Sequence, residues 1–367
     1  VSGVKIVEGT KILCVLGAAN LDEDQWPEAA RFDITRKTMG HLALGVGIHA
    51  CVGQTVARAE ADALLGTIAE KVDRIELAGK PVWRLVGEMA PEEIVRLVDF
   101  RYLTDELTPE EALNILQAAE PGKIARMQTL QAEGYPCYTT SAGWLGYSDD
   151  KLRRLCREAR AAGFTHTKFK VGQNLEDDIR RLTIARQELG DEMNIMIDAN
   201  QVWDVGQAID WVGKLAFARP LFIEEPTSPD DILGHKAIRD AVAPIGVATG
   251  EMCQNRILFK QFMAIGAIDY VQVDSCRLGG LNEVLAVQLM AAKFGLPVWP
   301  HAGGVGLCET VQHRSLIDSV PITGTKDDKR VEYVDHLHEH FVDPCVVRNG
   351  AYQAPERPGF SIQMKPK

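Results

Sequence analysis

Short apolar segments that each end in a polar or ionisable residue recur along the middle of this chain. Seven of them lie between Tyr135 and His301, and their ends are mostly 23 to 28 residues apart. That spacing accommodates one strand, one helix of three or four turns and two loops. The stretches between them have helical spacing of apolar residues and end in glycine, as in DDKLRRLCREARAAG, LEDDIRRLTIARQELG and GLNEVLAVQLMAAKFG. The sequence therefore predicts a repeated strand–helix unit.

Repetition of this unit closes a parallel sheet into a barrel whose strands all point their carboxyl ends at one mouth. We therefore expect an α/β protein with a (β/α)7β TIM-type barrel over about residues 133–334. A chain of 367 residues that is 46% hydrophobic has room for this barrel and for something smaller. Chemistry on such a fold gathers at the mouth, so the residues that end the strands are the candidates for a site.

Composition argues against several kinds of partner. A net charge of −11 and the lack of a basic stripe interleaved with aromatic residues argue against nucleic acid. No apolar run approaches the ~18 residues that cross a bilayer, and the first residues, VSGVKIVEGTK, lack the features of a signal peptide. We therefore expect a cytoplasmic protein without a membrane partner. The eight cysteines are dispersed and form no CxxC pair, which argues against a disulfide framework or a zinc site.

Acidic residues follow three successive predicted strands. Asp198 ends NIMIDAN, Glu224 is the first acid of PLFIEEP, and Glu251 follows GVATG, at spacings of 26 and 27 residues. Carboxylates that converge above a barrel repel one another, and a hard divalent cation relieves the repulsion; an oxygen-only set favours Mg²⁺ over zinc. The alternative is that each acid caps a helix or pairs with an arginine. The spacing leaves open whether Glu224 or Glu225 faces the metal, because adjacent strand residues point in opposite directions.

Ionisable residues also end three other predicted strands. Lys168 and Lys170 in THTKFKVG share a face, and burial beside a cation would lower a lysine pKa to the range a general base needs. A solvated pair is the alternative. Asp274 in YVQVDS and His301 in LPVWPHAGG form a candidate acid/base pair, although His301 could equally be a loop residue bonded to backbone. With a metal, these groups suit proton removal next to a carboxylate, ending in racemisation, cycloisomerisation or loss of water.

Stretches typical of one enzyme family run from about Gly79 to the C-terminus, among them DFRYLTDELTPEEAL, GYPCYTTSAGWLGYSDD, IEEPTSPDDILGH, VDSCRLGG, PHAGGVGLCE and EYVDHLHEHF. In these stretches the chain resembles the enolase superfamily, and within it the L-fuconate dehydratase group. The resemblance implies dehydration of an acid sugar, L-fuconate or a near relative, to a 2-keto-3-deoxy acid. It also implies Mg²⁺ held by Asp198, Glu224 and Glu251, which selects the first glutamate of EEP. Members of the group are commonly oligomeric, so the resemblance carries the expectation of a homo-oligomer.

The same resemblance implies roles for individual residues. Lys170 is the expected base that takes the proton from C2 of the sugar acid, with Lys168 beside it. His301 is the expected acid that assists departure of the C3 hydroxyl, and Asp274 orients it. The supporting residues that the resemblance implies are Asn200, as a substrate-binding group, and Glu332.

Residues 1–78 do not resemble the capping domain with which that family begins. QWPEAARFDITR and LALGVGIHACVGQTVARAEAD instead resemble the C-terminal part of the cysteine-ligated haem monooxygenases, the cytochromes P-450. Gly47, His49, Cys51 and Gly53 match the Cys loop of that family, while Leu44 takes its aromatic position. The resemblance implies haem ligation by Cys51. The segment lacks the distal helix and the ExxR helix of a haem pocket, which favours a free thiol instead.

The chain therefore resembles a fusion, and we expect four regions. These are a haem-thiolate-like segment over 1–78, a helical remnant of a capping domain over 79–132, the barrel over 133–334 and a C-terminal capping segment over 335–367. An incomplete cap leaves the mouth open, which predicts weak or unselective chemistry. The functional alternatives are another sugar-acid dehydratase or epimerase of the superfamily, a haem-thiolate monooxygenase fragment, and a catalytically inert fusion.

Overall fold

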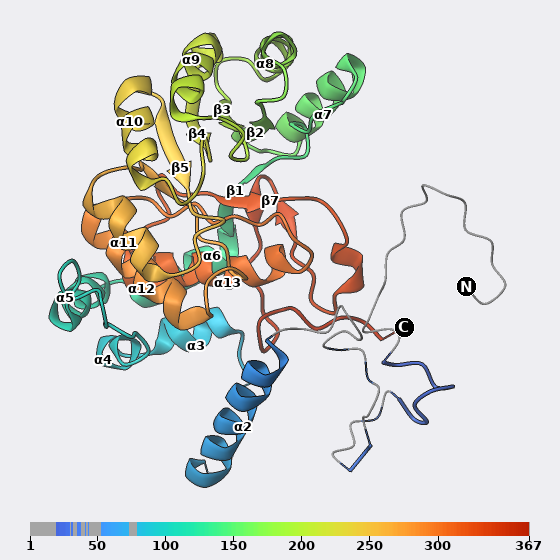
Figure 1. Cartoon of the computed structure of the whole chain (residues 1–367), viewed down its shortest axis with the longest axis vertical. Helices are drawn as coiled ribbons and strands as arrows, with labels where there is room; N and C mark the ends of the chain where they lie inside the picture. The colour runs from blue at the N-terminus through green and yellow to red at the C-terminus, as the bar shows by residue number, and fades with distance from the viewer. Residues whose placement is uncertain are drawn as a thin grey trace. The chain divides into compact units, whose positions relative to one another are not determined.

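The computed structural model describes residues 20–29, 31, 35–37, 41, 43, 53–72 and 79–366. The chain divides into two compact units, Val1–Leu77 and Ala78–Lys367, each of which is described by itself. In the first unit, helix α2 (Gln54–Lys71) has no buried residue and is the blue helix of Figure 1. Four residues of the predicted Cys loop, Leu44, Gly47, His49 and Cys51, lie outside the described residues.

Four helices precede the first strand of the second unit: α3 (Val82–Glu88), α4 (Pro91–Val95), α5 (Pro109–Ala119) and α6 (Lys123–Glu133). Helix α5 begins where Thr108 and Glu111 accept hydrogen bonds from each other's backbone amides, at 3.2 and 2.8 Å. Helix α3 packs on α13 (Leu307–Ile317), and α5 and α6 pack on η3 (Asp318–Ile322). The stretch predicted as a helical remnant is therefore helical, and it is anchored to the C-terminal half of the unit.

Strands and helices then alternate along the chain, as the repeat predicts. The strands are β1 (Tyr135–Thr139), β2 (His166–Lys170), β3 (Asn194–Asp198), β4 (Pro220–Glu224), β5 (Gly246–Thr249) and β6 (Tyr270–Val271). The helices that follow them are α7 (Asp149–Ala161), α8 (Leu175–Leu189), α9 (Val205–Leu215) with its 3-10 extension η2 (Ala216–Ala218), α10 (Ile232–Val242), α11 (Arg256–Ala264) and α12 (Leu281–Phe294). The three helices predicted from apolar spacing are confirmed within two residues at each end.

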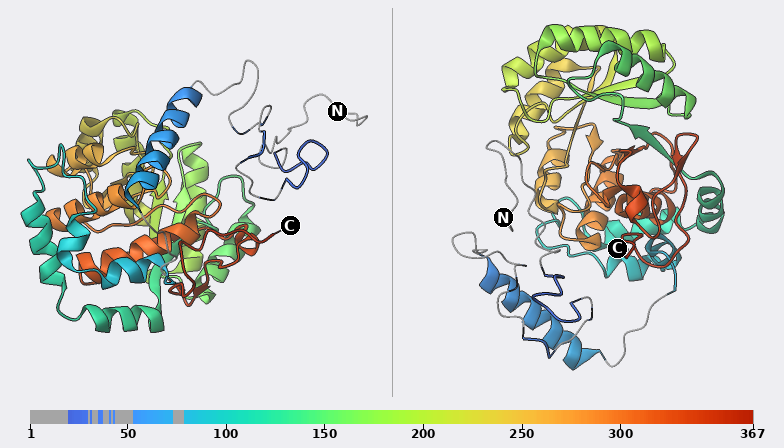
Figure 2. Two further views of the ribbon diagram at one scale, coloured as in Figure 1. Left: turned by 90° about the horizontal axis from the view of Figure 1, so that it is seen from below. Right: turned by 90° about the vertical axis from the view of Figure 1, so that its right-hand side faces the viewer.

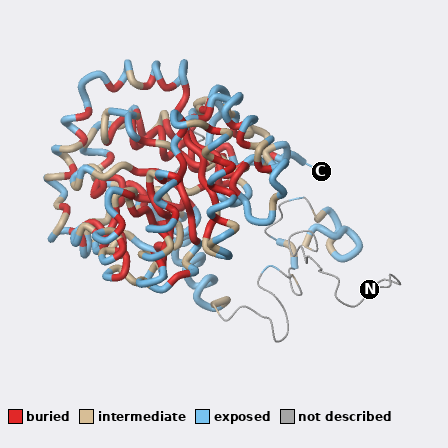
Figure 3. The backbone as a smooth tube through the Cα atoms, turned by 90° about the horizontal axis from the view of Figure 1, so that it is seen from above, coloured by how far each residue is buried: buried red, intermediate tan, exposed pale blue. Residues whose placement is uncertain are grey.

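The six strands pair in parallel in the order β6-β5-β4-β3-β2-β1. Figure 1 shows α7 to α10 outside the strands that they connect, and Figure 2 shows the same layering from two further sides. Both faces of this parallel sheet are buried, as is usual when helices cover it. One face belongs to the main core, and the other holds a small cluster of Tyr138, Met196, Phe222, Ala248 and Trp299. Figure 3 shows the buried residues gathered in the interior of this unit, with exposed residues around them.

The seventh strand, predicted to end at His301, does not form as a strand. The segment 297–301 makes only isolated parallel bridges to the chain after β5, at Val298 and His301. Its two prolines, Pro297 and Pro300, lack the backbone N–H groups that a continuous ladder would use. The prediction of a regular strand is therefore wrong. The segment nevertheless occupies the position expected for that strand, next to the residues that it bridges.

Pairing continues beyond this segment to the start of the sheet. The backbone N–H of Glu332, in β7 (Val331–Tyr333), donates to Pro300 O at 3.1 Å, and β7 pairs in parallel with β1. The remaining elements are η4 (His338–His340), β8 (Val347–Arg348) and β9 (Ala351–Tyr352), and β9 pairs antiparallel with β1. The observed fold is thus a mixed α/β architecture with a largely parallel nine-stranded sheet.

Within the part of the chain that the structure describes, none of the helices combines the length and the apolar character needed to cross a bilayer.

Trp83 offers a test of how the helices before β1 are anchored. Its side chain is 1% exposed, and its Nε1 donates to Pro355 O at 2.8 Å. We expect Trp83→Ala to lower the free energy of unfolding by about 3–5 kcal/mol, because it removes a large buried ring and leaves a carbonyl without its donor. Urea unfolding measures the change. The control Leu233→Ala, at a side chain that is 76% exposed, should change it by no more than about 0.5 kcal/mol. Equal losses in the two variants would contradict the anchoring role.

Candidate active site

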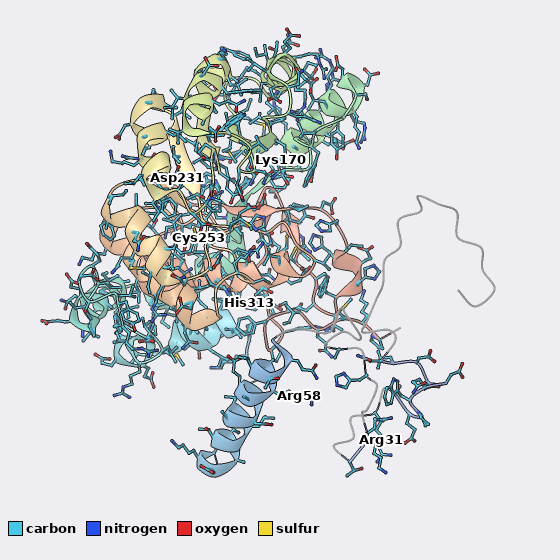
Figure 4. The ribbon with its side chains drawn as sticks, in the orientation of Figure 1. Arg31, Arg58, Lys170, Asp231, Cys253 and His313 are labelled. Carbon is cyan, nitrogen blue, oxygen red and sulfur yellow. The ribbon has the colours of Figure 1, made fainter. Side chains whose placement is uncertain are left out.

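Two lysines of β2 lie among carboxylates from neighbouring strands. Lys168 Nζ is 2.7 Å from both carboxylate oxygens of Glu224, 3.1 Å from Glu332 Oε1 and 3.4 Å from Asp198 Oδ2. Lys170, labelled in Figure 4, donates to Asp198 Oδ2 at 2.5 Å. The parallel register sets Lys170 beside Asp198 and Asp198 beside Glu224, which is why these side chains meet. The structure therefore brings four predicted strand-end residues to one place and adds Glu332 from β7.

These contacts decide the protonation of the lysines. Burial opposes the charge of Lys168, but Glu224 and Glu332 outweigh it, so its pKa lies well above the usual lysine value. Burial also opposes the charge of Lys170, and Asp198 outweighs it, so that pKa is raised as well. The pKa of Asp198 is lowered, because burial alone would raise it but the positive charges of the two lysines have the larger effect. The predicted lowering concerned lysines beside a bound cation and stays a prediction; without a cation, the attraction of the carboxylates for the two ammonium groups exceeds the penalty of burying them.

His301 faces this group from the other side. Its Nδ1 lies 2.7 Å from Asp274 Oδ2, and the other oxygen of Asp274 accepts two backbone N–H groups of the following turn. Its Nε2 lies 3.4 Å from Glu251 Oε2 and 3.7 Å from Glu332 Oε2. Burial opposes the charge of the imidazole, but Glu332 and Asp274 raise its pKa to about 9. The expected His–Asp pair is therefore formed, and His301 also has the backbone contact of the alternative, because the N–H of Gly303 donates to its Nε2 at 3.2 Å.

Three residues near the end of β3 and β4 have left-handed backbones, namely Asn200, Gln201 and Glu225, with φ of 44°, 67° and 40°. Non-glycine residues adopt this region rarely, and they cluster at functional sites. The backbone N–H of Asn200 donates to Asp198 Oδ1 at 2.9 Å, while its side chain is exposed. Glu225 accepts from Gln201 Nε2 at 2.9 Å, and burial raises its pKa to about 7. Glu224 and Glu225 thus have different partners.

Two polar residues of the site were not predicted from the sequence. Gln272 is fully buried and donates to Glu224 Oε2 at 2.6 Å. It lies two residues before Asp274, so strand alternation could have placed it on the same face. Arg181 of α8 is 1% exposed and donates to Lys170 O at 2.7 Å and to Gly143 O at 2.8 Å. No sequence signal distinguishes it from the other arginines of an amphipathic helix.

A cavity of about 430 Å³ lies between the two sides of the site. Lys170, Asp274, His301 and Glu332 line it, together with the half-exposed ring of Trp144. This volume is within the usual range for small-molecule sites. A larger cavity of about 1070 Å³ lies at the opposite, amino ends of the strands and is lined by none of the predicted site residues. Active sites of parallel α/β sheets lie at the carboxyl ends, so the smaller cavity is the candidate.

Residues 151–367 match the enolase C-terminal domain-like family, and this chain belongs to that family. Residues 1–73 match the cytochrome P-450 family instead. Over 78 residues the chain is 51% identical to a cytochrome P-450 of Rhodopseudomonas palustris, which covers 21% of this chain and 19% of that protein.

Relatives of the second unit include proteins named as sugar-acid dehydratases. L-galactonate dehydratase of Hypocrea jecorina is 59% identical over 293 residues, covering 78% of this chain and 65% of that protein. The crystal structure of human mitochondrial enolase superfamily member 1 is 53% identical, with a TM-score of 0.77 and coverage of 78% and 66%. That of L-talarate/galactarate dehydratase from Salmonella typhimurium, liganded with Mg and L-lyxarohydroxamate, is 29% identical, with a TM-score of 0.57 and coverage of 74% and 65%. The chain thus spans about two thirds of the length of these proteins.

Lys168 is expected to hold the site together when no other cation is present. Lys168→Met would leave buried carboxylates without their common partner, so we expect it to lower the free energy of unfolding by about 3–5 kcal/mol. Urea unfolding in the presence of a chelator measures this change. The control Lys236→Met removes a surface pair with Asp240, and we expect a change below about 1 kcal/mol. A Lys168→Met protein as stable as the control would mean that the carboxylates do not need this ammonium group.

Proposed function

We propose that this chain catalyses Mg²⁺-dependent dehydration of a six-carbon sugar acid in the cavity between Lys170 and His301. The observation that carries this proposal is the placement of a lysine and a His–Asp pair on opposite sides of one cavity, with buried carboxylates between them. An acid and a base on opposite sides suit the loss of a proton from one carbon and a hydroxyl from the next. The identity to L-galactonate dehydratase supports the same reaction class.

For the architecture, we propose a closed (β/α)7β barrel over 133–334, in which the bridged segment 297–301 serves as the seventh strand. The pairing from β6 through that segment to β7 and on to β1 supports closure. We also propose that 79–132 and 335–367 are the remaining parts of an incomplete cap, and that 1–78 is foreign to this enzyme family. The cytochrome P-450 match of residues 1–73 supports the last point. Haem ligation by Cys51 stays a prediction.

Asp198, Glu224 and Glu251 are the proposed Mg²⁺ ligands. They are oxygen donors only, which suits a hard divalent cation, and Glu251 Oε2 is buried without a hydrogen-bond partner. Lys168 now lies against Asp198 and Glu224, while His301 lies against Glu251, so positive groups of the chain face all three ligands. When bound, Mg²⁺ would supply a positive charge that stabilises the charge developing on the substrate carboxylate.

Lys170 is the proposed base, and His301 the proposed acid. In its unprotonated form, with the charge of Asp198 engaged by the metal, Lys170 Nζ would take the proton from C2, and the electron pair of the broken C2–H bond would delocalise into the substrate carboxylate as an enediolate. That electron pair would then form the C2–C3 double bond as the C3–O bond breaks. His301 Nε2 would donate a proton to the departing hydroxyl, which leaves as water, and Asp274 would hold the ring through Nδ1. The enol product then becomes a 2-keto-3-deoxy acid. Asn200 and Glu332 are proposed as supporting groups, the first for substrate binding.

The substrate proposed from the sequence is L-fuconate, and the 59% identical relative is named for L-galactonate. These acids share the configuration from C2 to C5 and differ at C6, where a methyl group replaces a hydroxymethyl group. The chemistry at C2 and C3 is therefore the same for both. Only contacts at the far end of the cavity can distinguish them, so both compounds belong in the first assay.

We expect the purified chain to form a 2-keto acid from L-galactonate or L-fuconate with Mg²⁺, and to lose this activity in excess EDTA. The absorbance of the semicarbazone formed from the 2-keto acid measures product both with Mg²⁺ and with excess EDTA. Activity that resists EDTA and metal-free buffer would contradict the metal proposal. No product from either acid, or from other six-carbon aldonic acids, would contradict the proposed function.

Proton exchange separates the two proposed catalytic roles. In D₂O, Lys170→Ala should lose both C2 exchange and product formation, by a factor of about 10² or more, because the base acts first. His301→Asn should lose product while retaining C2 exchange, because its proposed role is confined to loss of the hydroxyl. NMR of recovered substrate measures exchange. Lys236→Ala is the matched surface control and should behave as the unchanged protein. Turnover by Lys170→Ala at the rate of the unchanged protein would contradict the assignment of Lys170 as the base.

A further inference from the structure

A second group of potential ligands lies behind the loop that carries His301. Cys308 is in the first turn of α13, His338 begins η4, and Cys345 follows in the next loop. One ligand atom from each lies within 4.8 Å of the others. Both thiols are buried, and the imidazole is half-buried. The residues are 30 and 7 positions apart in sequence, a spacing that carries no recognisable metal motif, so only the fold brings them together.

The distances suit a tetrahedral ion bound by sulfur and nitrogen. Zinc bonds of about 2.3 Å to sulfur and about 2.0 Å to nitrogen place the two ligand atoms about 3.5 Å apart. Cys345 Sγ lies 3.5 Å from His338 Nδ1. His338 Nε2 lies 2.9 Å from Val334 O, and a backbone carbonyl on the second ring nitrogen is the usual partner of a metal-binding histidine. The other ring nitrogen, Nδ1, faces Glu309 Oε1 at 2.7 Å and Cys345 Sγ, and a metal ion at Nδ1 would take the place of the proton between the imidazole and the carboxylate.

A buried carboxylate completes the group. Glu309 is fully buried, and its Oε1 lies 2.7 Å from His338 Nδ1. Its Oε2 has no hydrogen-bond partner. A buried carboxylate oxygen without a partner is costly, and a cation beside it removes that cost. This orphaned oxygen is an observation independent of the thiols, and it belongs to the carboxylate that contacts His338 Nδ1.

We propose that Cys308, His338 and Cys345, with Glu309 as the fourth ligand, form a zinc site that joins the start of α13 to the segment after β7. Two thiolates and an imidazole select zinc over the hard cations that the carboxylates of the active site suit. Binding would release the two thiol protons and the proton that His338 shares with Glu309. The proposal does not depend on the proposed dehydratase activity.

The site would support the acid side of the cavity. Cys308 Sγ lies 3.6 Å from Ala302 O and 3.9 Å from Val334 O. Ala302 follows His301, and its backbone N–H donates to Glu332 Oε2 at 2.9 Å. Zinc at Cys308 would thus fix both chain segments that present the acid/base residues of this side. Its role would be structural, because all four positions are taken by protein ligands.

The test uses the full reduced chain, stripped with chelator and titrated with Zn²⁺ or Co²⁺ alone. We expect about one equivalent of Zn²⁺ per chain by elemental analysis, and the ultraviolet thiolate-to-metal charge-transfer band that Co²⁺ gives with cysteine ligands. The band in unaltered protein decides the proposal without any variant: Co²⁺ bound with no thiolate band would overturn it. A disulfide between Cys308 and Cys345 that persists after thiol reduction, shown by mass spectrometry, would also overturn it.

Variants then assign the ligands. Cys308→Ser and Cys345→Ser should each weaken the band and reduce zinc affinity at least tenfold, and Glu309→Gln should reduce it by about 10–100-fold. Cys156→Ser, at a buried thiol of α7, is the matched control and should keep the full band. Asp198→Asn should also keep it, because the active-site carboxylates are separate. A band that survives loss of both Cys308 and Cys345, or that Cys156→Ser abolishes, would place the ion elsewhere.

Discussion

The buried contacts of Lys168 are the constraint on which the candidate site depends. Asp198, Glu224 and Glu332 come from three different strands, and each would repel the others in an interior that excludes water. One ammonium group within 3.4 Å of all three balances that repulsion. The same charges hold the lysine protonated. The buried lysine and the three carboxylates are therefore one electrostatic unit, and a change at any member alters the protonation of the rest.

Strand pairing is regular from β2 to β4 and is interrupted in the segment 297–301, which contains two prolines. From β2 to β4, parallel register sets Lys170, Asp198 and Glu224 side by side. Between β6 and β7, two prolines reduce the ladder to isolated bridges, yet His301 still reaches Asp274. Three backbone hydrogen bonds hold the segment on the side of β6, and one joins it to β7. The acid side thus relies on side-chain and loop contacts more than on a sheet, and the proposed zinc site lies among those contacts.

The two units of the chain are similar to different protein families. The C-terminal unit spans about two thirds of the dehydratases it matches. The ring of Trp144, which lines the cavity beside Lys170, is 42% exposed. The side chains of Lys170 and His301 are more buried, and their charged partners Asp198 and Asp274 define their positions.

The sequence by itself determined the repeated strand–helix unit and the strand-end positions of Lys170, Asp198 and Glu224, and it offered His301 and Asp274 as a candidate pair. Local periodicity carries this information, because strand ends and helix ends depend on nearby residues. Only the tertiary structure decided the raised lysine pKa values, the separate partners of Glu224 and Glu225, the part played by Gln272 and Arg181, and the meeting of Cys308, His338 and Cys345. Each depends on distances between residues far apart in sequence, and on charges that act through space rather than along the chain.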